Sequence, residues 1–105
     1  MFESGHELSA EAYRDLPDTV QRLDVRQPWE YDLAHLPGTI LIPLGELSAR
    51  LGELDPARPV AAYCHHGARS MQALRILHAA GFRDIAHLAG GINAYSQLDP
   101  TVPRY

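Results

Sequence analysis

Apolar residues follow two different spacings along the chain, and the two spacings alternate. Short runs rich in β-branched and apolar residues are typical of strands, whereas apolar residues that recur every three or four positions are typical of amphipathic helices. The runs predict strands at 6–8, 20–25, 39–42, 60–63 and 85–88. The helical spacing predicts helices at 10–16, 28–36, 44–54, 70–80 and 92–98.

An alternation of strands and helices within 105 residues favours a three-layer α/β fold, in which helices cover both faces of a mostly parallel sheet. A chain of this length is close to the commonest domain size, so we expect a single domain over residues 1–105. Ligands of such sheets bind beyond the carboxyl ends of the strands. Residues that follow a strand are therefore the first candidates for chemistry.

Composition narrows the classes of function. The net charge is −4 and all nine basic residues are arginines, so the sequence lacks the basic pattern of a nucleic-acid-binding protein. The single cysteine excludes an internal disulfide, which is compatible with a reducing compartment. No apolar run approaches the ~20 residues of a membrane span, and the first residues lack the apolar core of a signal peptide. We therefore expect a cytoplasmic protein with no nucleic-acid or membrane partner.

The stretch PVAAYCHHGARS combines a thiol with an anion-binding loop. Cys64 stands at the carboxyl end of a predicted strand, and a tight loop separates it from the helix predicted from Ser70. Backbone N–H groups of such a loop and helix start can converge on an anion, which favours the thiolate form of a cysteine. Gly67 permits a positive φ in the loop, and Arg69 adds a permanent charge and a planar fork for oxyanions. An inert buried cysteine is the alternative interpretation.

The segment CHHGARS resembles the active-site loop of the rhodanese family of sulfurtransferases, whose pattern is C-x-x-G-x-R-S after a strand. Further segments are similar to other blocks of that family: LDVRQPWEY (23–31), HLPG (35–38), IP (42–43) and AGFRDIAHLAGGINAY (80–95). Ala34 and Tyr95 depart from the family, which often has glycine and tryptophan there, and both lie outside the loop. The resemblance implies an α/β fold with a five-stranded parallel sheet and no cofactor.

The resemblance also implies a ping-pong transfer of sulfur. Cys64 would take a sulfane sulfur from a donor such as thiosulfate, release sulfite and hold a persulfide, whose sulfur cyanide or a thiol then accepts. On this mapping Cys64 and Arg69 are catalytic, and the substrate-binding residues are His65, His66, Gly67, Ala68, Arg69 and Ser70, whose N–H groups cradle the anionic sulfur.

The ending LDPTVPRY is similar to the tails of rhodanese domains fused to adenylyltransferases, which load sulfur onto small carrier proteins. A sulfur-carrier protein is therefore among the expected partners. A relay module that passes persulfide sulfur to a protein partner, without turnover of its own, is the alternative to an enzyme. The rest of the tail is punctuated by prolines, and we expect it to lie over the surface.

A cysteine-dependent phosphatase or arsenate reductase is the nearest rival, because it shares the strand, loop and helix arrangement. The loop of that class has five residues between cysteine and arginine. Here only four residues separate Cys64 from Arg69. The shorter loop is expected to close too tightly for a tetrahedral phosphate ester, while a single sulfur atom fits.

The remaining charged and imidazole groups have simpler interpretations. Asp24, Arg26 and Glu30 are expected to form a structural ion-pair network that braces the junction between a strand and the following turn. His65 and His66 are adjacent, so they cannot present both rings on one helical face as metal ligands do, and we expect no metal site.

Overall fold

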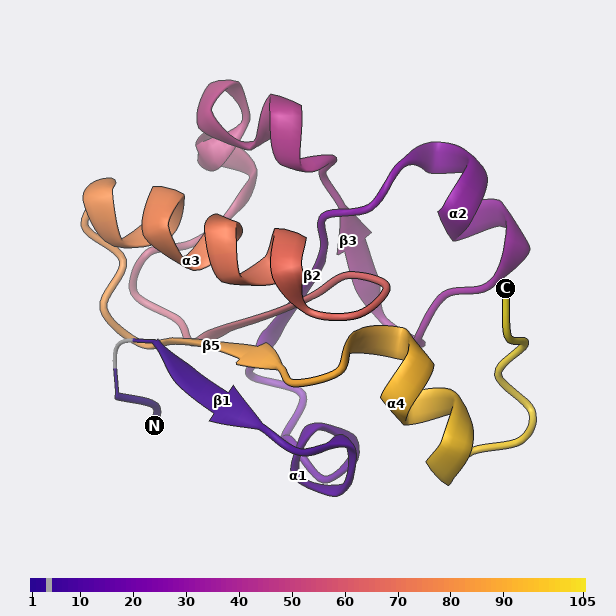
Figure 1. Ribbon diagram of the computed structural model, residues 1–105. Helices are drawn as coiled ribbons and strands as arrows, with labels where there is room; N and C mark the ends of the chain where they lie inside the picture. Colours follow the sequence, from indigo (N-terminus) through magenta and orange to yellow (C-terminus); the bar gives the residue numbers. More distant parts are fainter. Residues whose placement is uncertain (4) are drawn as a thin grey trace.

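A five-stranded parallel sheet forms the middle layer of the computed structural model, which describes residues 1–3 and 5–105 (Figure 1). Its strands are β1 (His6–Leu8), β2 (Gln21–Asp24), β3 (Thr39–Leu41), β4 (Val60–Tyr63) and β5 (Ile85–Leu88). The strands pair in the order β1-β5-β4-β2-β3, so β4 lies at the centre. The predicted α/β fold with five parallel strands is confirmed.

Helices cover both faces of this sheet. On one face α1 (Ala10–Arg14) packs against α4 (Gly91–Leu98), and on the other α3 (Ala68–Ala79) packs with the 3-10 helices η1 (Leu44–Ala49) and η2 (Leu51–Glu53) (Figure 1). The short helix α2 (Pro28–Leu33) follows β2. Within residues 1–3 and 5–105, no helix has both the length and the apolar character needed to cross a membrane.

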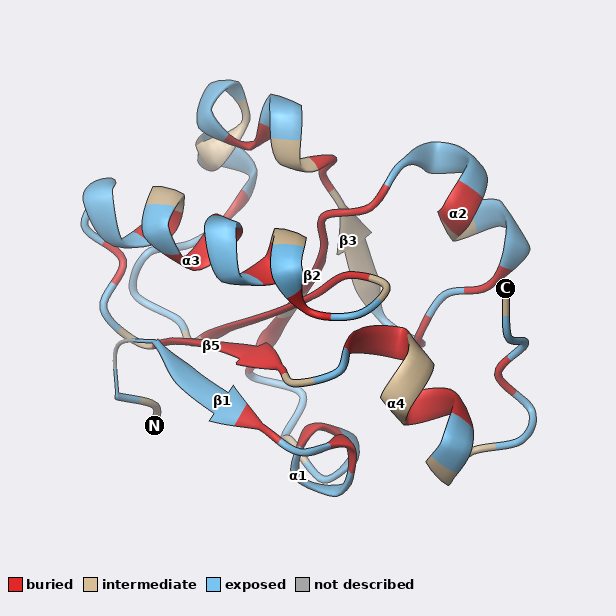
Figure 2. Ribbon diagram, in the orientation of Figure 1, coloured by how far each residue is buried: buried red, intermediate tan, exposed pale blue. Residues whose placement is uncertain are grey.

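Side chains of β4 alternate between two apolar cores. Val60 and Ala62 belong to the core beneath α3, whereas Ala61 and Tyr63 belong to the core beneath α1 and α4. This alternation is expected of a strand that is buried on both faces, because successive side chains point to opposite sides of a sheet. All residues of β4 and β5 are buried (Figure 2). The same alternation directs the next side chain, Cys64, toward the α3 side.

The segment 44–54 differs from the single amphipathic helix predicted there. It forms the two short 3-10 helices η1 and η2, which are separated at Arg50. Gly45 and Gly52 each lower the propensity for a continuous α-helix by up to ~1 kcal/mol relative to alanine. Leu44 and Leu47 of η1, and Leu51 of η2 and Leu54 directly after it, are three residues apart, the spacing at which side chains of a 3-10 helix share one face. The leucine spacing therefore identified the buried face correctly and the type of helix wrongly.

Candidate active site

The Cys64 side chain lies between the end of β4 and the start of α3. Its Sγ accepts hydrogen bonds from the backbone N–H groups of Gly67, at 3.1 Å, and Ser70, at 3.3 Å. Gly67 has a φ of 120°, a conformation that L side chains rarely adopt, and this turn aims both N–H groups at the sulfur. These donors and the N-terminus of the twelve-residue helix α3 favour a negative charge on Sγ.

The carbonyl groups of the same loop are fixed by the start of α4. The Ile92 N–H donates to the Cys64 carbonyl at 2.8 Å, and the Asn93 N–H donates to the His65 carbonyl at 3.1 Å. Gly91, which has a φ of 62°, approaches so closely that a Cβ atom there would collide with both carbonyls. The glycine pair at the start of α4 therefore lets the backbone of α4 dock directly on the loop that holds the thiol.

Arg69 lies in the first turn of α3, because this helix begins at Ala68, two residues before the predicted start. Its guanidinium makes a bidentate ion pair with Glu30 of α2, through Nη1–Oε1 at 2.6 Å and Nη2–Oε2 at 2.9 Å. The Arg69 hydrogen bonds lower the pKa of Glu30 to about 2, although burial acts in the opposite direction. The Arg69 side chain remains one-third exposed, so its charge faces both Glu30 and solvent.

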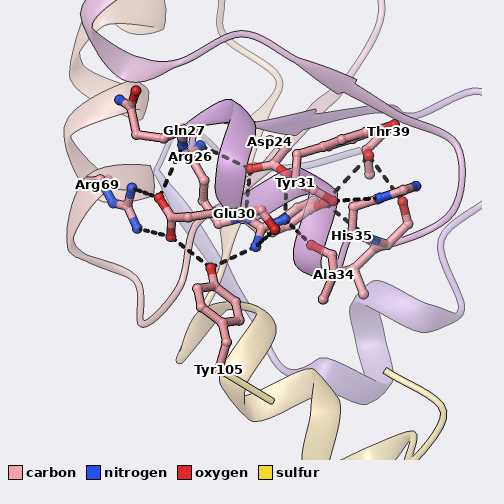
Figure 3. A network of polar contacts seen from close by, with 12 residues as sticks. Asp24, Arg26, Gln27, Glu30, Tyr31, Ala34, His35, Thr39, Arg69 and Tyr105 are labelled. Atoms are coloured by element: carbon pink, nitrogen blue, oxygen red, sulfur yellow. Dashed lines mark hydrogen bonds and ion pairs between the residues drawn. The ribbon is translucent and has the colours of Figure 1, made fainter. Parts of the chain in front are cut away.

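The expected ion-pair network extends inward from Glu30 and is shown in Figure 3. Arg26 pairs with Asp24 through Nη2–Oδ2 at 2.7 Å and Nε–Oδ1 at 2.9 Å, and both side chains are fully buried. Arg26 Nη2 also donates to the Ala34 carbonyl at 2.6 Å. These contacts fasten α2 to the end of β2, and they place Glu30 where it can hold Arg69.

The C-terminal tail enters this network, which corrects the expectation that it simply lies over the surface. The Tyr105 hydroxyl donates to Glu30 Oε2 at 2.7 Å and accepts from Arg26 Nη1 at 2.7 Å. Burial raises the pKa of Tyr105 to about 12, so the hydroxyl keeps the proton that it donates. The Tyr105 ring stacks on the His65 ring with centroids 4.1 Å apart, and His65 stacks on His66. Tyr105 therefore forms one wall of the loop's outer side.

The six predicted substrate-binding residues fall into two groups. Gly67 and Ser70 are buried, and their N–H groups are the two that contact Sγ. The others line the outer side of the loop, where His66 and Ala68 are exposed and His65 and Arg69 are partly exposed. Burial and the neighbouring His66 lower the pKa of His65, which favours its neutral ring.

Two residues beside the loop were missed by the sequence reasoning. Tyr105 is one, and the only signal for it was an aromatic residue at the end of a polar, proline-rich tail. The other is the buried His87 of β5, whose Nδ1 lies 2.9 Å from Ser70 Oγ. Its position in an apolar strand was a signal, since a buried imidazole needs a polar partner.

A family model described as "Rhodanese-like domain" matches residues 9–98 of the chain. The chain belongs to the rhodanese-like family. A crystal structure of a rhodanese-related protein from Thermoplasma volcanium superposes with a TM-score of 0.83 at 28% identity, covering 90% of this chain and 93% of that one. This family membership and the parallel sheet agree with the predicted resemblance.

Two of the curated relatives have names that refer to different roles in sulfur chemistry. The chain is 36% identical over 93 residues to the "Putative sulfur carrier protein YrkF" of Bacillus subtilis, covering 86% of this chain and 50% of the relative. It is 30% identical over 81 residues to the "Thiosulfate sulfurtransferase GlpE" of Shewanella oneidensis, covering 77% of this chain and 80% of the relative. The chain spans only 27% to 50% of the length of several longer relatives. A role in sulfur transfer is thus supported at the level of the family.

Proposed function

We propose that this protein is a sulfurtransferase that carries a sulfane sulfur as a persulfide on Cys64. The observation that carries the proposal is the environment of Cys64 Sγ. The Cys64 residue is almost fully buried, and its Sγ accepts hydrogen bonds from the Gly67 and Ser70 N–H groups at the start of α3. Charge-assisted hydrogen bonds from fixed N–H groups stabilise a thiolate, and the thiolate is the nucleophilic form of cysteine.

In the first half-reaction the Cys64 thiolate attacks the outer sulfur of thiosulfate. The new Sγ–S bond forms as the sulfur–sulfur bond of thiosulfate breaks, and sulfite leaves with the electron pair of that bond. The product is a persulfide whose terminal sulfur carries a negative charge. The same loop that stabilises the thiolate is suited to this adduct, because its N–H donors are already oriented and need no reorganisation.

In the second half-reaction an acceptor takes the terminal sulfur. Cyanide attacks that sulfur to give thiocyanate, or a thiolate attacks it to give a new persulfide, and in both cases Cys64 leaves as the thiolate. The covering of Cys64 keeps bulk water from the reactive adduct between the two steps. No metal or cofactor enters either step.

The outer side of the loop is proposed to select the donor. Arg69 keeps a partly exposed positive charge on the outer side of the loop, and such a charge raises the local concentration of anions such as thiosulfate. His65, His66 and Ala68 lie on the same outer side, partly or fully exposed. The physiological acceptor is proposed to be a thiol, either a small molecule or a sulfur-carrier protein, in the cytoplasm.

Formation of thiocyanate from thiosulfate and cyanide tests the proposal. We expect turnover by the wild-type protein and none by Cys64→Ser, whose fold is checked by urea denaturation. A matched control is the double variant Cys64→Ser with Ser48→Cys, which moves the single thiol to an exposed site on η1. Turnover by either variant at the wild-type rate would show that the Cys64 loop is not the catalyst.

A relay module is the second candidate function, and the position of Tyr105 favours it. Its ring stacks on His65 on the outer side of the loop, a position that is suited to an acceptor guided in by a protein surface. A relative that covers much of this chain is also named a sulfur carrier. The relay predicts that Cys64 forms a persulfide from thiosulfate but releases its sulfur to cyanide only slowly. Rapid steady-state turnover with cyanide supports the enzyme instead.

A further inference from the structure

A chain of polar groups runs from Cys64 to β1 on the inner side of the loop, away from His65 and Tyr105. Cys64 Sγ lies 3.6 Å from Ser70 Oγ, and Ser70 Oγ lies 2.9 Å from His87 Nδ1. On the other side of the imidazole, His87 Nε2 lies 3.7 Å from Glu7 Oε1. Ser70 and His87 are both buried, whereas the Glu7 side chain is largely exposed. The chain therefore links the buried thiol to solvent.

The sheet register explains how these groups meet. In the parallel pair β1–β5, Glu7 is the direct partner of His87, so both side chains project from the same face of the sheet. On the neighbouring strand β4, Ala62 is the partner of His87, and its small side chain leaves room for the ring. Helix α3 lies on this face and turns Ser70 inward from its first turn. Strands β1 and β5, the residue that follows β4 and helix α3 thus bring these polar groups into a single line.

Glu7 lies on the Nε2 side of the His87 ring, with Oε1 3.7 Å from Nε2. A carboxylate beside Nε2 favours the tautomer that carries hydrogen on Nε2, and Nδ1 is then a free acceptor. The Ser70 hydroxyl has two acceptors within reach, Nδ1 at 2.9 Å and the Gly67 carbonyl at 3.1 Å. With Nδ1 unprotonated, Ser70 can donate to His87 and accept a proton from the Cys64 thiol.

We propose that Ser70 and His87 form a proton relay that accepts the proton of the Cys64 thiol. The S–H proton passes to Ser70 Oγ as the hydroxyl proton of Ser70 passes to His87 Nδ1. Cys64 becomes a thiolate, Ser70 is unchanged, and His87 becomes an imidazolium next to the Glu7 carboxylate. No oxidant or co-reactant is needed. The inference takes from the proposed function only that Cys64 is the reactive thiol, and it assigns His87 as the base for that thiol.

The proton can leave through a cavity of about 540 Å³ between α3 and β1, because His87 forms part of its wall. Glu7, Arg75 and His78 are the other charged or titratable groups around it. Arg75 and His78 lie on exposed positions of α3, and Glu7 lies on β1. Glu7 is the group within ion-pair distance of the His87 ring, so it is the carboxylate that offsets the imidazolium charge.

Titration of the thiolate tests the relay without any sulfur donor. The ultraviolet absorbance of the thiolate is followed against pH for the wild-type protein, His87→Gln and Ser70→Ala. Each substitution removes the positive charge that the relay places near the thiolate, and a nearby positive charge favours the thiolate form. We therefore expect both variants to shift the midpoint upward by about one unit, which is about a tenfold loss of thiolate below the midpoint. His78→Gln, which removes an exposed imidazole near the same cavity, is the matched control and should leave the midpoint in place.

The double variant Ser70→Ala with His87→Gln separates a relay from two unrelated effects. Members of one relay lose their function together, so the double variant should shift the midpoint no further than either single variant. A wild-type midpoint in His87→Gln, or additive shifts in the double variant, would overturn the proposal. Urea denaturation confirms the fold of each variant, and His87→Asn replaces His87→Gln if the latter does not fold.

The titration also distinguishes this inference from the proposed function. If the variants shift the midpoint but the wild-type protein takes up no sulfur, the relay is supported and the proposed sulfurtransferase function is excluded. If the protein takes up sulfur but His87→Gln does not change the midpoint, the sulfurtransferase function is retained and the relay is excluded.

Discussion

Replacing Glu30 by glutamine tests how Arg69 is held. Glu30→Gln keeps the size of the side chain but removes its charge, so the Arg69 guanidinium loses a bidentate partner at 2.6 and 2.9 Å. Arg69, the Tyr105 hydroxyl and the Gln27 N–H all donate to the Glu30 carboxylate. The amide of glutamine replaces one of the two acceptor oxygens with an NH₂ group, which cannot accept these hydrogen bonds. We expect a less stable protein in which the first turn of α3 is no longer fixed to α2.

The magnitude follows from the pKa of Glu30, which is about 2 in the folded protein and 4.5 for a free glutamate. A difference of this size corresponds to about 3 kcal/mol of folding free energy at neutral pH. Because the Arg69 side chain is one-third exposed, solvent screens part of the interaction, and we expect Glu30→Gln to lose about 2 kcal/mol. For a domain of this size the melting temperature should fall by roughly 8–16 °C.

The pH dependence provides an independent check on the same contribution. The folded-state pKa of Glu30 is depressed, so its stabilising contribution is fully present above about pH 4.5 and is lost as the pH falls toward about 2. Protonated Glu30 resembles glutamine in charge. The stability difference between the wild type and Glu30→Gln should therefore be constant near neutral pH and shrink below pH 4.5.

Urea denaturation of both proteins between pH 7 and pH 3 measures these differences directly. Glu53→Gln is the matched control, since Glu53 pairs with Arg50 by a similar contact at the surface and its side chain is half exposed. An exposed pair of this kind contributes little, so Glu53→Gln should change the stability much less. Equal losses in the two variants, or a Glu30→Gln difference that does not depend on pH, would show that the charge of Glu30 does not stabilise the fold through Arg69.

Three further substitutions address the loop and its entrance. Gly91→Ala should abolish sulfur transfer and destabilise the fold, because its Cβ would collide with the Cys64 and His65 carbonyls. Gly52→Ala is the control and should be close to neutral in the same assays, because the space around Gly52 is open. An active Gly91→Ala would contradict the docking of α4 on the loop. Arg69→Ala should raise the KM for thiosulfate more than it lowers kcat, and unchanged thiosulfate kinetics would remove Arg69 from donor binding. Tyr105→Ala should speed sulfur transfer to bulky thiols more than to cyanide, because it removes the ring that stacks on His65. An equal change for both acceptors would show that Tyr105 does not restrict access to the loop.

Local patterns predicted the framework of the site well. The strands at 60–63 and 85–88 were placed to the residue, because each is a short apolar run bounded by turn residues. The alternation along β4 then fixes the side on which Cys64 lies, and Gly67 adopts the positive φ that its position suggested. Each of these features depends on neighbours within a few residues, which a sequence displays directly.

Contacts between distant residues could not be predicted in the same way. Tyr105 meets Arg26 across 79 residues, and Ser70 meets His87 across 17. Neither contact follows from a spacing rule, because each depends on how separate elements pack. Arg69 was predicted to face the donor, yet its strongest contacts are with Glu30, since the position of α2 relative to α3 is not visible in the sequence.

The mass of the intact protein after reaction with thiosulfate shows whether Cys64 becomes a persulfide. We expect the wild-type protein to gain one sulfur atom, which peptide mapping places on Cys64 and a reducing thiol removes. The Cys64→Ser variant should gain none. A wild-type protein whose mass stays unchanged, while its thiol still reacts with an alkylating reagent, would contradict the persulfide on which the proposed function depends.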